Sequence, residues 1–488
     1  MRNPSLFIAF GSIVVVALLP RCGDGTTDCT QTSTCPSEAG DGPPPLSCDT
    51  SKDPKDAPGC LDDRVGVFVS PTGNDTNPGT KALPFQTIGK ALSSVGALTR
   101  VYVCEGTYSE DVAMTPPVDG ISLYGGFKCS DWTYTGNKPT VGKGQIALKI
   151  TGTTKPISIE DIMFKAADGG GANTSSIAAL VAGATAPVTF TRVNLTAGVG
   201  TPGSDGAAGS NYNAGLAASD PSIAGHNASG NAGGGLQTCA NLCTDSQTTN
   251  PSNGGQGGAG GGAPSSGSGG APALGGGTAG TAGQACNGAG SGGDGNPSPT
   301  TGADATTPAA LGTLSDTGWA PGTSASGKNG APGQGGGGGA GTAQGGGGGG
   351  ACGGCGGGGG TGAGGGGASI ALAVVSTPVT VNASELHAGD AGNGGKGGAG
   401  QDGQLGGAHG NGGGCSGGAG GKGSAGGTGA GGVGGISVGV LYKGSAPTID
   451  PTTTTGTTVG KAGTKGVGGK AGTNDGIDGI AQPSMQAP

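Results

Sequence analysis

Large and charged side chains are scarce in this chain of 488 residues, of which 3% are aromatic and 11% are charged. A core of large side chains therefore cannot extend along the whole length, and any core must be concentrated in short apolar stretches. The net charge of −8 is modest, and no basic patch is interleaved with aromatic residues. We therefore expect no nucleic acid among the partners of this protein.

Catalytic and metal-binding patterns are missing as well. The three histidines, His226, His387 and His409, do not have the spacing of metal ligands. No Gly-x-Ser-x-Gly elbow between a strand and a helix is present, since the match at 414–418 lies inside a glycine-rich stretch, and no Gly-Lys-Ser or Gly-Lys-Thr follows a strand. We therefore expect neither a nucleophile elbow nor a phosphate loop. Cys352 and Cys355 would need a second ligand pair to hold zinc, and disulfides explain them better in an exported chain. We expect no catalytic residue, no cofactor and no metal site.

Glycine, by contrast, is abundant: 122 glycines and 31 prolines place much of the chain among low-complexity sequences. Glycine dominates the stretches 199–367 and 390–433 and a tail over 461–488, and in the first two it recurs locally at every third position. This period matches an extended left-handed helix of the polyproline or polyglycine type, whose bare face permits close packing. Two alternatives stay open: a flexible brush, because glycine costs the most entropy to order, and a bundle of polyglycine helices.

Cysteines bear on this choice. Cys352 and Cys355 would lie about 9 Å apart in an extended threefold helix, which is too far for a bond between them. If the stretches are ordered, these two cysteines should pair with residues such as Cys286 or Cys415 and join the helices of a bundle. Another pair, Cys239 and Cys243, could instead close a small local loop.

The N-terminus predicts export. An apolar run over residues 6–19 is too short to span a bilayer but suits a secretory signal. The Leu-Pro-Arg-Cys sequence that ends at Cys22 resembles a bacterial lipobox, with Arg21 where that pattern has a small residue. We expect residues 1–22 to be a signal, with two outcomes open: lipidation of Cys22, or cleavage elsewhere without an anchor.

The number of cysteines agrees with an oxidising destination. Setting Cys22 aside from the 13 cysteines leaves 12, an even number that can all pair. Four of them lie in residues 23–62, a stretch rich in Pro, Ser, Asp and Gly that we interpret as a tether. The expected location is the outer membrane or cell surface, as a lipoprotein, or the medium, as a secreted protein.

Ordered sequence is expected from residue 63 onward, because short β runs separated by Gly and Pro recur there at solenoid spacing. Three prolines each precede, by eight residues, an apolar residue that ends a strand pattern: Pro156, Pro187 and Pro378, with Pro447 starting a weaker fourth copy. An apolar strand precedes each copy, so we expect its residues Ile146, Ile177 and Ile370 to stack in one ladder. The coils then occupy 63–198, 368–389 and 434–460, and the glycine stretches leave successive coils at the same corner.

The first coil also carries a resemblance. The sequences Ser-Pro-Thr-Gly-Asn-Asp at 70–75, Asn-Pro-Gly-Thr at 77–80 and Pro-Phe-Gln-Thr-Ile at 84–88 resemble the opening of a bacterial domain family of unknown function within the pectin-lyase-like superfamily. The resemblance implies an all-β fold, a right-handed parallel β-helix or solenoid with a short N-terminal capping helix. It implies no activity, because that superfamily holds both lyases and silent scaffolds. The glycine-rich insertions are similar to the repeats of PE-PGRS proteins.

Two features follow from the expected coils. Cys104 and Cys129 are 25 residues apart, close to one coil, and equivalent positions on neighbouring coils lie about 4.8 Å apart, so we expect a disulfide between them. Glu160, Asp161 and Arg192 are the only fragments of a lyase-like site. Because adjacent residues of a strand face opposite sides, we expect a solvated coil surface rather than a cluster.

One further group of polar residues lies in the first coil. Asn74, Asp75 and Asn77 could offer oxygen ligands to Ca²⁺, but such residues are also the usual makers of turns, which is the interpretation we favour.

Three functions remain after these exclusions. The first is a non-enzymatic cell-surface or secreted structural or adhesion protein that displays glycine-rich loops from a β-helix. The alternatives are a carbohydrate-binding β-helix, which needs an aromatic-lined groove although Trp132 and Trp319 are the only tryptophans, and a polysaccharide lyase or hydrolase, which needs carboxylates clustered around a basic residue. The partners expected are surface polysaccharide or other envelope components, and the membrane through a lipid on Cys22.

Overall fold

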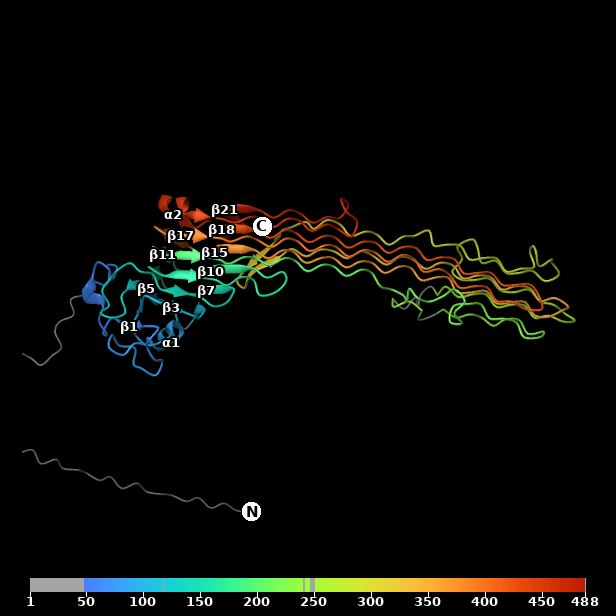
Figure 1. Ribbon diagram of the computed structural model, residues 1–488, viewed down its shortest axis with the longest axis horizontal. Helices are drawn as coiled ribbons and strands as arrows, with labels where there is room; N and C mark the ends of the chain where they lie inside the picture. The colour runs from blue at the N-terminus through green and yellow to red at the C-terminus, as the bar shows by residue number, and fades with distance from the viewer. Residues whose placement is uncertain (1–47, 117, 240–241, 246–250, 488) are drawn as a thin grey trace, which may run out of the picture. The chain divides into compact units, whose positions relative to one another are not determined.

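A computed structural model describes residues 48–487 except 117, 240–241 and 246–250. Residues 1–47, with the expected signal and Cys22, lie outside the described residues. Three parallel sheets account for most of the regular structure (Figure 1). No helix among the described residues is long and apolar enough to cross a membrane.

Each sheet collects strands from successive coils. Sheet 1 holds β1 (Gly66–Val69), β2 (Arg100–Cys104), β5 (Ser122–Phe127), β8 (Ile157–Glu160), β11 (Val188–Thr191), β16 (Val379–Asn382) and β19 (Thr448–Ile449). Sheet 2 holds β4 (Val112–Met114), β7 (Ile146–Thr151), β10 (Ser176–Ala182), β15 (Ser369–Val375), β18 (Ser437–Lys443) and β21 (Ala481–Gln486). Sheet 3 holds β3 (Thr107–Tyr108), β6 (Thr140–Val141), β9 (Met163–Lys165), β12 (Asn194–Thr196), β17 (Glu385–His387) and β20 (Thr457–Thr458).

From β4 onward the chain visits the sheets in the constant order 2, 1, 3, as in β10, β11 and β12, and every pairing between coils is parallel. This is the parallel β-helix that the sequence predicts. The expected ladder is confirmed, because Ile177 pairs with Ile146 on one side and Ile370 on the other. The weak fourth copy is shifted by one residue, since Ile449 pairs with Val381 and Pro447 therefore lies opposite Val379.

The core lies between the three sheets. Residues at equivalent positions of successive coils form stacks, such as Ile159, Phe190 and Val381, all of them fully buried. Stacked β-branched and aromatic residues suit the pleated inner surface of a sheet. At about 1.5–3 kcal/mol for each large apolar side chain, these stacks are the main stabilisation of the coils.

The short helix α1 (Ile88–Ser94) closes the N-terminal end of the solenoid, as the resemblance implies. It begins at Ile88, and just before it Phe85 pairs with Val69 in a bridge. The carboxylate of Glu110 accepts hydrogen bonds from the amides of Ile88 and Gly89, where a negative charge complements the helix dipole.

The last coil ends differently from the tail that the sequence predicts for 461–488. The short helix α2 (Pro451–Thr455) precedes β20, and β21 adds a final strand to sheet 2. Because the carbonyl of Ile480 accepts from Ser437 of β18, strand alternation turns Pro483 toward the free edge of the sheet. Proline lacks the N–H that a further strand would need, so it protects this edge from pairing.

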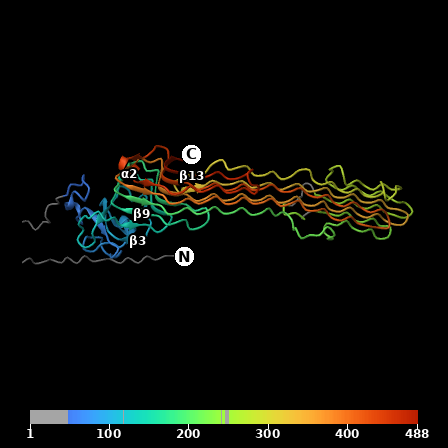
Figure 2. The ribbon, with the colours of Figure 1, turned by 45° about the horizontal axis from the view of Figure 1, so that its top comes forward.

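The glycine stretches leave the solenoid after β12, β17 and β20, all in sheet 3, and return to β15, β18 and β21 in sheet 2. They run side by side as an extended bundle (Figures 1 and 2). Amides at every third residue bond a neighbouring segment: Gly392, Gly395 and Gly398 donate to the carbonyls of Gly367, Gly364 and Thr361. The glycine stretches therefore form a bundle of polyglycine-type helices, and the flexible brush is the wrong alternative.

The direction of the segments follows a simple rule. Segments 199–210, 389–412 and 460–471 run away from the coils and lie in one layer, while 346–367 and 415–436 run back in the next. Neighbours are parallel within a layer and antiparallel between these two layers, as the paired steps of three show. The bundle thus continues the stacking order of the coils, with one segment for each coil in each layer.

A small hairpin interrupts the longest glycine stretch. Strands β13 (Gly312–Ser315) and β14 (Gly318–Pro321) bring Leu314 and Trp319 onto the outer face of sheet 2, against Ile177 and Ile370. No core was expected within residues 199–367. The hairpin gives sheet 2 a second apolar cluster on its outer side.

Residues 48–62, which the sequence analysis assigned to the tether, belong to the folded unit. The segment contains a short 3₁₀ turn, Pro58–Cys60, and a disulfide joins Cys48 to Cys60. The Tyr102 hydroxyl donates a hydrogen bond to the carbonyl of Cys60 at 2.6 Å. The segment lacks apolar runs, and it is ordered by this disulfide and by polar contacts with sheet 1.

Candidate functional site

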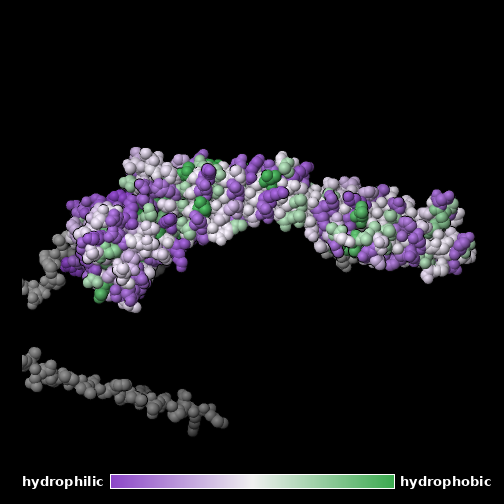
Figure 3. Space-filling model, in the orientation of Figure 1, coloured by the Kyte–Doolittle hydropathy of each residue, from purple (hydrophilic) through white to green (hydrophobic). Residues whose placement is uncertain are grey.

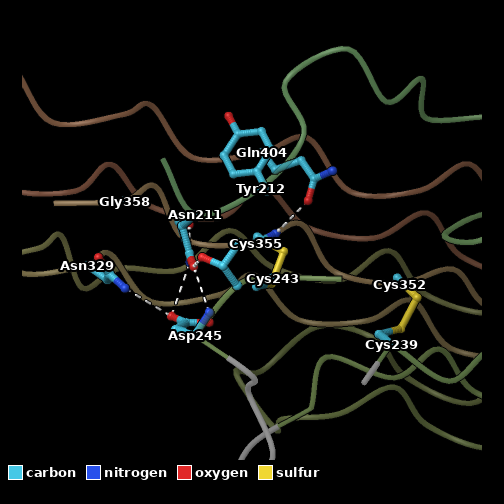
Figure 4. The surroundings of a disulfide bond; sticks show 12 residues. Asn211, Tyr212, Cys239, Cys243, Asp245, Asn329, Cys352, Cys355, Gly358 and Gln404 are labelled. Carbon is cyan, nitrogen blue, oxygen red and sulfur yellow. Dashed lines mark hydrogen bonds between the residues drawn. A yellow bond between two sulfur atoms is a disulfide. The ribbon is translucent and has the colours of Figure 1, made fainter. Parts of the chain in front are cut away.

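Three disulfides join the glycine segments to one another: Cys239–Cys352, Cys243–Cys355 and Cys286–Cys415. The expected partners were wrong, because Cys286 and Cys415 bond each other and neither pairs with Cys352 or Cys355. The local loop between Cys239 and Cys243 is wrong too. Both cysteines instead bond to cysteines of segment 346–367 (Figure 4). The expected disulfide between Cys104 and Cys129 is present in the coils.

Asn211 organises the bundle beside the Cys243–Cys355 disulfide (Figure 4). Its amide nitrogen donates to the carbonyl of Gly356 at 2.9 Å and to the carboxylate of Asp245 at 3.1 Å. Its amide oxygen accepts from the hydroxyl of Thr244 and the amide of Asp245. The side chain is buried, and these four bonds satisfy its capacity almost completely. Asn211 therefore fixes the point where the chain leaves the first outward segment.

Around the disulfides, side-chain amides take the place of backbone groups as hydrogen-bond partners of the glycine segments. The oxygen of Gln404 accepts from the amide of Cys355 at 3.1 Å. At the edges of the bundle aspartates do the same, as when Asp205 accepts from the amide of Lys396 and Asp390 from that of Lys461. Backbone groups that lack a neighbouring segment are thus satisfied from within the chain.

The only clustered charges that the sequence analysis considered lie at one corner of the coils. The Arg192 guanidinium is 2.8 Å from Asp161, 3.0 Å from Glu160 and 3.3 Å from Asp53. The expected dispersal of Glu160 and Asp161 is wrong, because the two acids converge on the same cation. Asp53 comes from the segment before the first coil, which sequence reasoning did not connect with this corner.

The backbone explains this convergence. Asp161 and Arg192 have φ values of +53° and +54°, and Ala383, on the next coil, has +46°. These left-handed residues end β8, β11 and β16, and there the alternation of an extended strand no longer applies. The proline alignment contained the signal, since each of the three follows its proline by the same interval.

Burial sets the electrostatics of the corner. Burial raises the pKa of Glu160 to about 7, and the charge of Asp53 adds to this rise while Arg192 opposes it. For Arg192, burial lowers the pKa, but the hydrogen bonds and charges of Asp161 and Glu160 outweigh burial and hold it above its usual range. Arg192 therefore stays protonated, and its guanidinium binds carboxylates of the protein itself. A protonated guanidinium cannot accept a proton from a substrate.

The other candidate residues serve the fold. The carboxylate of Asp75 accepts bonds from the amides of Gln86 and Thr87 just before α1, and Asn74 accepts from the amide of Thr76. Asn77 donates to a backbone carbonyl. These residues form a turn, as the favoured interpretation states, and the bonded oxygens of Asn74 and Asp75 face the chain. No group of three or more His, Cys, Asp or Glu suited to a metal occurs among the described residues.

The surface offers no broad apolar area on the face shown in Figure 3. Within the described part of the chain, the exposed large apolar residues are separate: Leu83, Tyr134, Val199, Leu236, Leu405 and Val467. Both tryptophans are buried, Trp132 against Phe68 and Trp319 beneath the hairpin. Both tryptophans thus contribute to apolar cores.

A family model described as a protein of unknown function (DUF1565) matches residues 71–237. This family is associated with parallel β-helix proteins, in agreement with the coils. The matched range takes in α1, the coils up to β12 and the first outward glycine segment. No curated protein and no solved structure matches the chain. The comparisons therefore support the fold, and the function has to be argued from the structure.

Proposed function

We propose that this protein is a non-enzymatic structural or adhesion protein of the cell surface or the secreted matrix. Its β-helix is the base, and the glycine bundle is a stiff arm that carries contact surfaces away from that base. We also propose that the coils are related to pectin-lyase-like proteins and that the glycine stretches are similar to those of PE-PGRS proteins. Surface polysaccharide and other envelope components are the partners proposed.

The packing of the bundle is the observation that carries the proposal. Segment 346–367 alone bonds to 201–226, 252–258, 327–339, 392–410 and 415–436. At about 3.1 Å for each residue, this segment spans about 70 Å. A buried segment of that length, joined by disulfides to its neighbours, suits a mechanical spacer better than a flexible display loop.

The alternatives lack support from the residues that they need. A lyase requires a basic residue that is free to take a proton, and Arg192 is held by three carboxylates. A carbohydrate module of the usual kind requires exposed aromatic rings, and both tryptophans are buried. The disulfides agree with the proposed export, and a lipid on Cys22 is proposed as the anchor.

The test compares producing cells with cells from which the gene has been deleted, and with cells that make the Cys286→Ser, Cys415→Ser variant. We expect deletion to lower attachment to polysaccharide-coated surfaces or to neighbouring cells, and the variant to give an intermediate loss because its arm is less stiff. Unchanged attachment after deletion contradicts the proposal. Release of unsaturated or reducing sugar ends by the purified chain would support the lyase or hydrolase instead.

A further inference from the structure

The segment 48–61, called the strap below, crosses the outer face of sheet 1. The Cys48–Cys60 disulfide closes it into a loop whose ends are 4.5 Å apart between Cα atoms. The anchor nearest to the coils is the bond from Tyr102 to the carbonyl of Cys60. Toward the other end, Arg100 donates to the carbonyl of Thr50 at 2.6 Å. The strap can therefore move as one unit, about the end that joins the first coil.

The third anchor of the strap is electrostatic. Asp53 approaches Arg192, which also faces Glu160 and Asp161, so one cation meets three carboxylates within 3.3 Å. The side chain of Asp161 is only 5% exposed and that of Glu160 only 7%. A single guanidinium leaves this group with a surplus of negative charge, in a place where water does little to screen it.

Further charged and titratable groups surround the cluster, and among them Tyr134 and Lys138 interact with Asp161 and Arg192. Tyr124 is the partner of Glu160 on the adjacent strand, Arg100 stacks over the ring of Tyr124, and Lys55 of the strap interacts with Asp53 and Arg192. Lys55 bonds Asp56, and Arg100 bonds the strap backbone, so neither forms an ion pair with Glu160. The cluster can lower its surplus charge by keeping a proton.

We propose that the strap is a pH-dependent latch, fastened to the solenoid by a proton held between Asp53 and Glu160 and loosened when that proton is lost. In the fastened state the Glu160 carboxylic acid donates a hydrogen bond to the Asp53 carboxylate. Loss of the proton replaces this bond with repulsion between two carboxylates. The Tyr102 and Arg100 anchors remain, so the strap loosens without unfolding the coils.

The direction of the effect follows from the pKa of Glu160. Burial raises it from an ordinary 4.5 to about 7, with the charge of Asp53 adding to the rise. The fastened form therefore binds the proton more tightly than the open form. The stabilisation is complete below pH 4.5 and is lost as the pH rises from there to about 7, beyond which both forms are deprotonated.

Hydrogen exchange of the full chain measures the latch directly. Amides of residues 48–61 are compared at pH 6 and pH 8 after correction for the intrinsic rate. The opening constant should be higher at pH 8 than at pH 6. A complete return of Glu160 to its ordinary pKa of 4.5 on opening sets the upper bound of this rise at about tenfold. Amides of β10 and β11 should show no such change.

Variants make the result decisive. Glu160→Gln keeps the donor but removes the titration, so its ratio between the two pH values should fall to about one, with the strap protected at both. Asp53→Asn should also bring the ratio toward one, and it serves if the buried variant fails to fold. Asp56→Asn, on the strap but outside the cluster, should retain the ratio of the natural protein. A ratio near one in the natural protein, or an unchanged ratio in Glu160→Gln, overturns the proposal.

Discussion

At the scale of single residues, the bundle depends on the absence of side chains at its inward positions. A Cβ added at Gly357 would lie 1.8 Å from the carbonyl oxygen of Gln401, and one at Gly341 would lie 1.8 Å from that of Ala259. The neighbour in both cases is backbone, which cannot turn aside as a flexible side chain does. Ordering glycine is costly in entropy, and the bonds that each segment makes to several neighbours offset that cost.

We therefore expect Gly357→Ala to lower the free energy of unfolding of the bundle by about 2–3 kcal/mol, since overpacking forces the segments apart. Gly262→Ala is the matched control, because a Cβ there meets nothing within 4 Å. Its effect should stay within about 0.5 kcal/mol. Urea unfolding followed by hydrogen exchange of bundle amides measures both. Equal effects of the two variants would show that close packing does not select glycine at position 357.

At the scale of elements, the sequence predicted the strands of the coils, because their positions follow a short-range period. The proline-to-apolar interval located β8, β11 and β16, because each coil repeats one pattern. It missed the hairpin that carries Trp319, which is flanked by glycine and shows no period. It also failed to decide between brush and bundle, since both have the same composition. The deciding bonds join residues far apart, such as Gly398 and Thr361 or Gly354 and Gly421.

The contact between Asp161 and Arg192 was also missed, although the repeat pattern contained the information needed to predict it. Asp161 and Arg192 occupy equivalent positions of aligned coils, so the alignment could have placed them together. The error came from extending strand alternation into a turn with positive φ. Asp53 could not have been found in this way, because the strap belongs to no repeat.

The disulfides of the bundle close loops with sequence separations of 113, 112 and 129 residues. Long loops gain most from such links in the chain-entropy account, by about 2–5 kcal/mol each. We expect Cys286→Ser with Cys415→Ser to increase exchange in segments 277–300 and 403–422 while the coils stay protected. Cys48→Ser with Cys60→Ser is the control and should affect the strap alone. An equal increase of exchange along the whole chain would contradict the expectation that the outer part of the bundle opens independently of the coils.

At the scale of the whole described unit, a solenoid and a bundle share one stacking order. The coils determine which glycine segments become neighbours, and the last coil ends the series with Pro483 at its free edge. Growth of the bundle is therefore set by the number of coils that bear insertions. The unit joins a base with an apolar core to an arm held mainly by backbone bonds.

This combination predicts a particular outline. Negative-stain electron microscopy of the full chain should show a compact body with a straight projection of about 70 Å. Treatment with a reductant should leave the body unchanged and make the outer part of the projection less regular. A body surrounded by diffuse density, with no projection, would favour the flexible brush.

Segment 346–367 lies in the middle of the bundle, and its neighbours come from both earlier and later parts of the chain. The bundle therefore cannot be completed while the chain is still emerging, since residues up to 436 must be available first. A glycine-rich chain with few apolar groups has little tendency to collapse before then. Such a chain would pass through a narrow export channel as an extended thread, and closure of the coils would afterwards bring its distant parts together.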